Sequence, residues 1–153
     1  MNANATKAIS TASLILVVVV ISSASDDNVL TFRAQFGSKL LWYGVTDAVI
    51  DSTPAWSDLD NSPPLSAKRA IEVAKKAVVR FEEEGRVKSL PDILEWKINK
   101  LTLKPLDNEK WLWLVSFEAS PKPGAGMMGI SPEISVVVTM DGHVLSPSVR
   151  EPT

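Results

Sequence analysis

The sequence contains no cysteine and only one histidine, His143. The absence of cysteine excludes disulfide bonds, Cys nucleophiles, iron–sulfur clusters and Cys-based zinc sites. The net charge is also small, because the sequence has 16 Lys and Arg residues and 18 Asp and Glu residues, which gives a formal charge of −2. A chain this close to neutrality is poorly suited to collect phosphates, so we do not expect a nucleic-acid partner. We also expect no cofactor, no metal and no catalytic residues.

Long apolar runs are scarce as well, and the clearest one is Leu14–Ile21. It follows Lys7 and precedes the small residues 22–24. A basic start, a short apolar core and small residues at the cleavage site are typical of a secretory signal. We therefore predict a signal peptide over residues 1–24, cleaved after Ala24, and an extracytoplasmic location, periplasmic or secreted, in a bacterium. The alternative is an uncleaved anchor, although a full membrane span needs about 20 mainly apolar residues.

Residues 25–64 are predicted to form an N-terminal extension and a linker. Apolar and polar side chains alternate over residues 28–36, which indicates a β-strand. Residues 39–50 fit either a helix or a strand, because their apolar spacing is helical but Gly44 interrupts it. Residues 52–64 are rich in Pro, Ser, Asp and Asn, which favour turns and connections.

The clearest element is an amphipathic helix that follows Ser66 and ends at Gly85. Serine is a good N-cap, and glycine is common just after the last helical turn. The apolar residues recur every three or four positions: Ala70, Ile71, Ala74, Ala77, Val78 and Phe81. The cationic residues lie mostly off that stripe: Lys68, Arg69, Lys75, Lys76 and Arg80. We interpret the acidic run 82–84 as a solvated last turn rather than a binding patch.

The C-terminal half predicts strands and turns. Between Trp96 and Leu103 the apolar phase shifts by one residue, which indicates a β-bulge near Asn99–Lys100. Residues 111–117 are apolar on both faces, as is typical of a strand covered twice. Residues 133–140 form a further strand, and Asp141–Gly142 is a strong hairpin turn before a short returning strand.

This order of a helix followed by three or four strands resembles the PepSY-like domain, a module of secreted peptidase propeptides and of small exported bacterial proteins. The segments that carry the resemblance are 65–74, 96–98, 101–103, 111–117 and 134–144. The resemblance implies an inhibitory or protein-binding role for some members and supplies no catalytic residues.

The pattern and the resemblance together lead us to expect an α+β fold. One long amphipathic helix would pack on an antiparallel sheet of three to four strands, with the signal segment in front. The PepSY-like domain would cover residues 65–147 and leave a tail at 148–153.

Three patterns suggest a site but fit a structural role better. Residues 124–129 read G-x-G-x-x-G, but prolines precede them and a strand follows, so we expect a hairpin loop rather than a nucleotide site. Residues 58–62 resemble the start of a calcium loop, yet its sixth and twelfth positions hold Pro63 and Arg69, so a turn is expected. His143 follows a hairpin turn with no nucleophile pattern beside it. A hydrolase would need converging carboxylates, and the sequence singles out no pair.

Candidate partner-binding residues come from the aromatic residues and the methionines. The chain holds five tryptophans, and strand alternation places Trp111 and Trp113 on one face. We expect these two in the core, or in a binding platform if the helix does not cover that face. Met127 and Met128 lie in a loop, where flexible Met side chains suit adaptable partner contacts unless the loop folds back on the sheet.

From these observations we expect an exported, non-catalytic protein-binding or regulatory domain. The resemblance suggests a secreted or envelope peptidase as the protein that it modulates. The alternative is a structural envelope protein tethered to the membrane by an uncleaved N-terminal anchor. Contact with the membrane is expected only through that segment.

Overall fold

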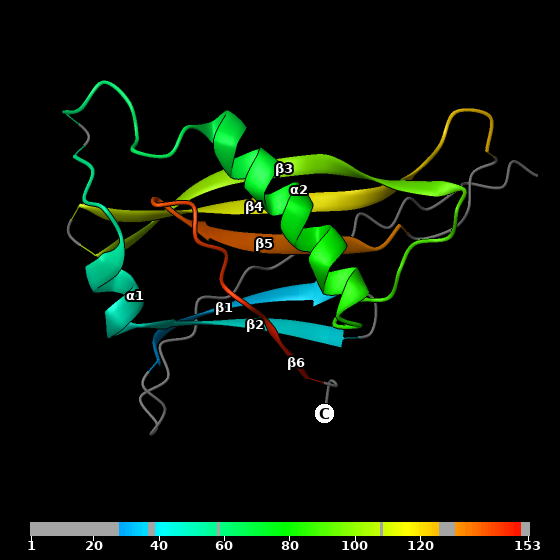
Figure 1. The fold of residues 1–153 in the computed structure, drawn as a ribbon, viewed down its shortest axis with the longest axis horizontal. Coiled ribbons are helices and arrows are strands. Elements are labelled where there is room, and N and C mark those ends of the chain that lie inside the picture. Colours follow the sequence, from blue (N-terminus) through cyan, green and yellow to red (C-terminus); the bar gives the residue numbers. More distant parts are fainter. Residues whose placement is uncertain (1–27, 37–38, 58, 108, 126–130, 151–153) are drawn as a thin grey trace, which may run out of the picture.

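The structure is a computed structural model, which describes residues 28–36, 39–57, 59–107, 109–125 and 131–150, with backbone alone for residues 28–36 and 107. The described residues form an α+β fold with one three-stranded antiparallel sheet, a smaller sheet and two helices (Figure 1). The elements are β1 (Asn28–Phe36), β2 (Lys39–Thr46), α1 (Asp47–Ser52), α2 (Ala67–Glu83), β3 (Leu94–Asp107), β4 (Lys110–Pro121), β5 (Glu133–Thr139) and β6 (Ser148–Arg150). The predicted signal segment 1–24 lies outside the described residues.

The central sheet has the strand order β3-β4-β5, with both pairs antiparallel. Its register shifts between Ile98 and Lys100, so the predicted bulge is confirmed. The chain turns after β5 as predicted, but the turn is one residue longer than the predicted Asp141–Gly142 pair. The amide of Gly142 donates to the carbonyl of Thr139 at 2.9 Å, which makes Met140 and Asp141 the central residues, and of these turn residues only Gly142 has a positive φ, of 86°. The chain then returns through a single bridge between Val138 and Val144 rather than a full strand.

The second sheet has the order β1-β2-β6 and comes from segments outside the predicted domain. The ambiguous residues 39–50 contain both elements: β2 ends at Thr46, and α1 begins at Asp47. Thr46 caps this short helix, because its hydroxyl accepts from the amide of Val49 at 3.3 Å. The predicted extension 25–64 thus supplies β1, β2 and α1, and the predicted tail 148–153 supplies β6.

Helix α2 forms where the apolar stripe predicts it. The Ser66 hydroxyl accepts from the amide of Arg69 at 3.3 Å and caps the first turn. The buried residues of the helix are Ala70, Ala74, Ala77, Val78 and Phe81. Gly85 follows the last turn with a φ of 69°, a conformation that glycine adopts readily. Figure 1 shows α2 crossing one face of the central sheet, where it contacts β4 and β5.

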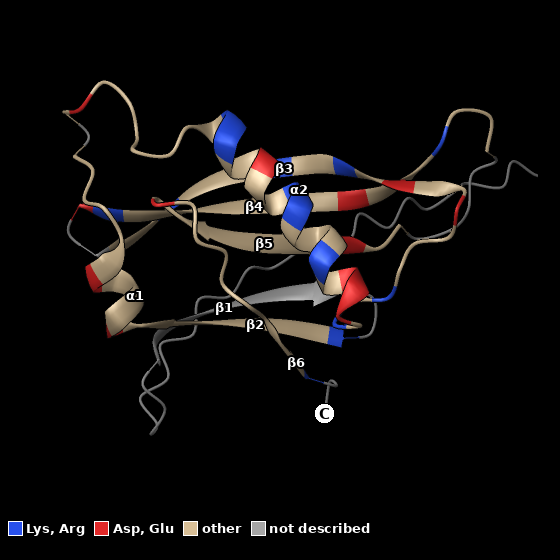
Figure 2. Ribbon diagram, viewed as in Figure 1, with Lys and Arg blue, Asp and Glu red and all other residues tan. Residues whose placement is uncertain are grey.

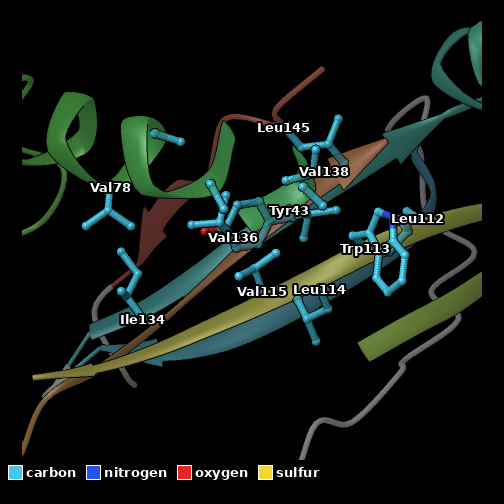
Figure 3. Close-up of a cluster of buried hydrophobic side chains, with 14 of the residues drawn as sticks. Tyr43, Val78, Leu112, Trp113, Leu114, Val115, Ile134, Val136, Val138 and Leu145 are labelled. Carbon is cyan, nitrogen blue, oxygen red and sulfur yellow. The ribbon is translucent and has the colours of Figure 1, made fainter. Parts of the chain in front are cut away.

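Both sheets share one hydrophobic core. Leu41, Tyr43 and Val45 of β2 are fully buried in the same cluster as Phe81 of α2 and Phe117 of β4. Figure 3 shows the Tyr43 ring close to valine side chains of β4 and β5. Its hydroxyl donates to the backbone carbonyl of Ser135 on β5. The second sheet therefore packs beside β5, while residues 143–145 bond to the end of the β5 edge that β4 leaves free (Figure 1).

Candidate functional site

The tryptophans of the central sheet are structural. Trp113 is only 8% exposed, and its indole N–H donates to the carbonyl of Leu65 at 2.9 Å. Its ring faces the start of α2 and offers no open platform to a partner. Trp111 is half-buried and donates to the carbonyl of Trp56 at 3.1 Å, with the two rings edge-on at a centroid distance of 5.7 Å. Met127 and Met128 lie outside the described residues.

One of the three acidic residues at the end of α2 does not have the solvated role that the sequence predicts. We expected residues 82–84 to be solvated, but Glu82 is half-buried and accepts from the indole N–H of Trp96 at 3.1 Å. The same carboxylate oxygen accepts from the amide of Leu90 at 3.3 Å. Glu82 therefore fastens β3 and the loop before it to the end of the helix. Glu83 and Glu84 are exposed, as predicted.

The face of the central sheet away from α2 is the strongest candidate for a binding site, and we call it the outer face. Successive side chains of a strand point to opposite faces. Because Trp113 points toward α2, its neighbours Leu112 and Leu114 point to the outer face. The register then places Lys100, Ser116 and Ser135 in one row across the three strands, and Thr102 with Leu114 in the next.

A shallow cavity of about 170 Å³ opens on the outer face, and we call it the outer-face cavity. Its lining residues are Asn99, Lys100, Thr102, Lys104, Leu114, Ser116, Glu133 and Ser135. The hydroxyls of Ser116 and Ser135 lie 2.8 Å apart and hydrogen-bond to each other. The cavity thus combines one apolar side chain with hydroxyl, amide and charged groups, a composition suited to a polar ligand or peptide.

The charges of the outer-face cavity are unevenly distributed. Lys100 and Lys104 line the β3 side, and within the described part of the chain neither forms an ion pair. Glu133 lies at the β5 side, where its carboxylate accepts from the side-chain amide of Asn99 at 3.4 Å. The cross-strand neighbour of Glu133 is Glu118, a second carboxylate. The cavity therefore has a cationic wall on β3 and an acidic end.

Burial and the negative charge of Glu118 raise the pKa of Glu133 above its usual value. Both causes disfavour the ionised carboxylate in the folded chain. Because the folded chain holds this proton more tightly than the unfolded chain, stability falls as the pH rises through the interval between the unfolded and the folded pKa values. Above that interval, the ionised Glu133 lowers the free energy of unfolding.

Replacing Glu133 by Gln is therefore expected to raise the free energy of unfolding at pH 7. The gain should be below about 1 kcal/mol, because water still screens this half-buried group. It should vanish below about pH 4, where the unfolded carboxyl is also protonated. Urea unfolding of both chains at pH 7 and pH 3.5 measures the effect. In a chain that already carries Glu118→Gln the gain should shrink, and an unchanged gain would contradict the interaction of the two carboxylates.

The other residues that the sequence singled out have structural roles. His143 is exposed, and its amide donates to the Asp141 carboxylate at 3.2 Å. Burial acts to raise the pKa of Asp141, but hydrogen bonds from Thr139 and His143 outweigh it and lower that pKa. These bonds close the turn after β5. The Asp60 carboxylate accepts from the amide of Ser57 at 3.1 Å, which supports the predicted turn role of this segment.

The strands on either side of the glycine-rich segment 124–129 do not have the arrangement of a dinucleotide-binding site. A dinucleotide site requires parallel strands joined by a helix. Here β4 and β5 are antiparallel neighbours, and residues 126–129 of the segment lie outside the described residues. Within the described ranges, no three His, Cys, Asp or Glu side chains are grouped closely enough to hold a metal ion. The helices that the structure describes include none that is both long and apolar enough to cross a membrane.

The outer-face cavity is only partly visible in the sequence. After the bulge at Asn99, the polar residues Lys100, Thr102 and Lys104 alternate with Leu101 and Leu103. This alternation predicts one polar and one apolar face. It does not reveal that Ser116 and Ser135 complete the polar row, because that depends on the pairing of three strands.

Comparison of the chain with models of known protein families, with curated proteins and with solved structures found no match.

Proposed function

We propose that the chain is an exported, non-catalytic protein-binding domain that uses its outer face to hold a segment of another secreted or envelope protein. The observation that supports this most directly is the open outer-face cavity, in which Lys100 and Lys104 form no ion pair with any described residue. Cationic side chains around an otherwise polar cavity are suited to capture complementary groups of a partner.

The division of the central sheet into two unlike faces also supports the proposal. On the α2 side, Val115, Phe117 and Val136 are fully buried in the core. On the outer side, Thr102, Ser116 and Ser135 are only half-buried and Lys100 is exposed. Leu112, Leu114 and Val137 of the outer face are also buried, so its polar surface is confined to the part around the cavity. There the hollow gives a partner a defined place to bind.

The chemistry of the cavity argues for binding rather than catalysis. The Ser116 and Ser135 hydroxyls hydrogen-bond to each other. A serine nucleophile needs an adjacent base to remove its proton. The only histidine of the sequence, His143, is exposed in the turn after β5, where its backbone amide donates to Asp141, and it does not line the cavity. A peptidase regulator of the type that the PepSY-like resemblance suggests requires only such a binding surface.

Site-specific photo-cross-linking in the native host tests this function. A photo-activatable amino acid at position 99, where Asn99 is exposed and lines the cavity, is expected to capture one discrete protein. The same group at position 76, where Lys76 is exposed on α2, serves as the matched control. Equal capture at both positions, or none at position 99, would overturn the proposal. Mass spectrometry of the bait also reports its first residue, which we expect to be Ser25.

A further inference from the structure

The exposed edge of the central sheet is β3. Among the described strands β3 pairs only with β4, so its other side is an edge. An edge strand presents unpaired N–H and C=O groups that can bind an extended peptide as an additional strand. Two features limit the usable stretch: the bulge between Ile98 and Lys100, and Pro105, which has no N–H to donate. Residues 100–104 remain as a regular edge.

The side chains of this stretch alternate in character. Leu101 and Leu103 are half-buried and pack against the core on the α2 side. Lys100, Thr102 and Lys104 line the outer-face cavity. Figure 2 shows basic residues on β3. Any strand added at this edge would therefore place every second side chain beside two lysines and one threonine.

The charge of the stretch decides which strand fits. Two copies of β3 would bring Lys100 and Lys104 against lysines of the second copy, and like charges on neighbouring strands are destabilising. Acidic residues at the same positions would form favourable cross-strand pairs. Because Lys100 and Lys104 are four residues apart along the strand, the matching carboxylates should be four residues apart as well.

We propose that residues 100–104 of β3 bind an extended acidic segment of a partner protein, which adds to the central sheet as a fourth strand. Acidic residues at positions i and i+4 of that segment lie beside Lys100 and Lys104, and the residue between them lies beside Thr102. This inference rests on the proposed protein-binding function and adds the chemistry and conformation of the bound segment. Backbone hydrogen bonds supply affinity, and the two lysines select the acidic sequence.

Fluorescence anisotropy with defined peptides tests the selection by charge. An octapeptide of alternating Thr and Glu is expected to bind the full chain at least about 10-fold more tightly than one of alternating Thr and Lys, with affinity falling as salt rises. The double variant Lys100→Glu, Lys104→Glu should lose at least about 10-fold in affinity for the Thr-Glu peptide. The matched control Lys75→Glu, Lys76→Glu changes the net charge equally at two exposed residues of α2 and should bind as the original chain does.

A second peptide tests whether the segment binds as a strand. Methylation of every second backbone nitrogen of the Thr-Glu peptide keeps its charge but removes donors to β3, so its affinity should fall at least about 10-fold. Unchanged affinity of the methylated peptide, or no binding of the Thr-Glu peptide, would overturn the inference. So would equal affinity of the two double variants, with circular dichroism confirming that both are folded.

The inference and the proposed function can fail separately. If position 99 captures its protein equally well in the Lys100→Glu, Lys104→Glu chain, the domain binds a partner but not through an acidic strand. That result overturns the inference and leaves the proposed function standing. If position 99 captures nothing while the Thr-Glu peptide binds as described, the edge selects acidic strands and the proposed partner protein is wrong.

Discussion

Replacement of Phe81 by alanine is expected to lower the free energy of unfolding by about 3–5 kcal/mol, the usual cost of removing a buried aromatic ring. Phe81 is fully buried near the end of α2 and is among the largest such side chains in the core. The carbonyl of Phe81 also accepts from the amides of Arg86 and Val87, which hold the turn after the helix. A cavity at this position would loosen the contact between α2 and the sheets and leave the backbone bonds in place.

Val79→Ala is the matched control for Phe81→Ala. Val79 lies on the same helix two residues earlier, but 52% of it is exposed. Alanine has the higher helix propensity, so we expect a change within about 0.5 kcal/mol. Urea unfolding followed by circular dichroism measures both variants. A loss below about 1 kcal/mol for Phe81→Ala, or equal losses for the two variants, would show that α2 does not pack on the core as described.

Replacement of Tyr43 by alanine is expected to cost a similar amount, about 3–5 kcal/mol. Tyr43 is a fully buried side chain in β2, a strand that the sequence analysis placed outside the domain. Tyr43→Phe keeps the ring and removes only the hydrogen bond to the Ser135 carbonyl, so it should cost about 1–2 kcal/mol. The ordering of the two losses separates ring packing from the hydrogen bond between the sheets.

The ionisation of Tyr43 gives an independent test of the same contact. Burial raises the pKa of the Tyr43 phenol far above its usual value. Above about pH 10 the unfolded chain releases this proton and the folded chain keeps it, so stability falls as the pH rises. Tyr43 is the only tyrosine in the sequence. Phenolate absorbance should therefore appear only together with alkaline unfolding.

The control for the Tyr43 variants is Val149→Ala in β6, an edge strand that pairs with β2 in the same sheet. Val149 is 36% exposed, and its replacement should change stability by less than about 1 kcal/mol. Titration of the phenol near pH 10 in the folded chain, or a cost of Tyr43→Ala no larger than that of Val149→Ala, would contradict the burial of β2 against β5.

Local patterns were enough to predict several elements. The cap at Ser66 and the apolar stripe of α2 depend on contacts within a few residues of the chain. The bulge near Asn99 is visible because a single extra residue moves every later side chain to the other face. The turn after β5 was predictable because Gly142 readily adopts its positive φ, although its exact length was not. The α+β class follows from these elements together.

Only the tertiary structure decided how distant segments combine. Residues 39–46 and 148–150 pair in one sheet although more than half the chain lies between them. The outer-face cavity joins three strands, and its composition depends on which residue of β4 stands opposite Lys100 and which of β5 stands opposite Ser116. The sequence alone determined the local elements, because short-range sterics and hydrogen bonds govern them. Strand pairing, the burial of Trp113 and the grouping of charges depend on non-local packing, which no short pattern encodes.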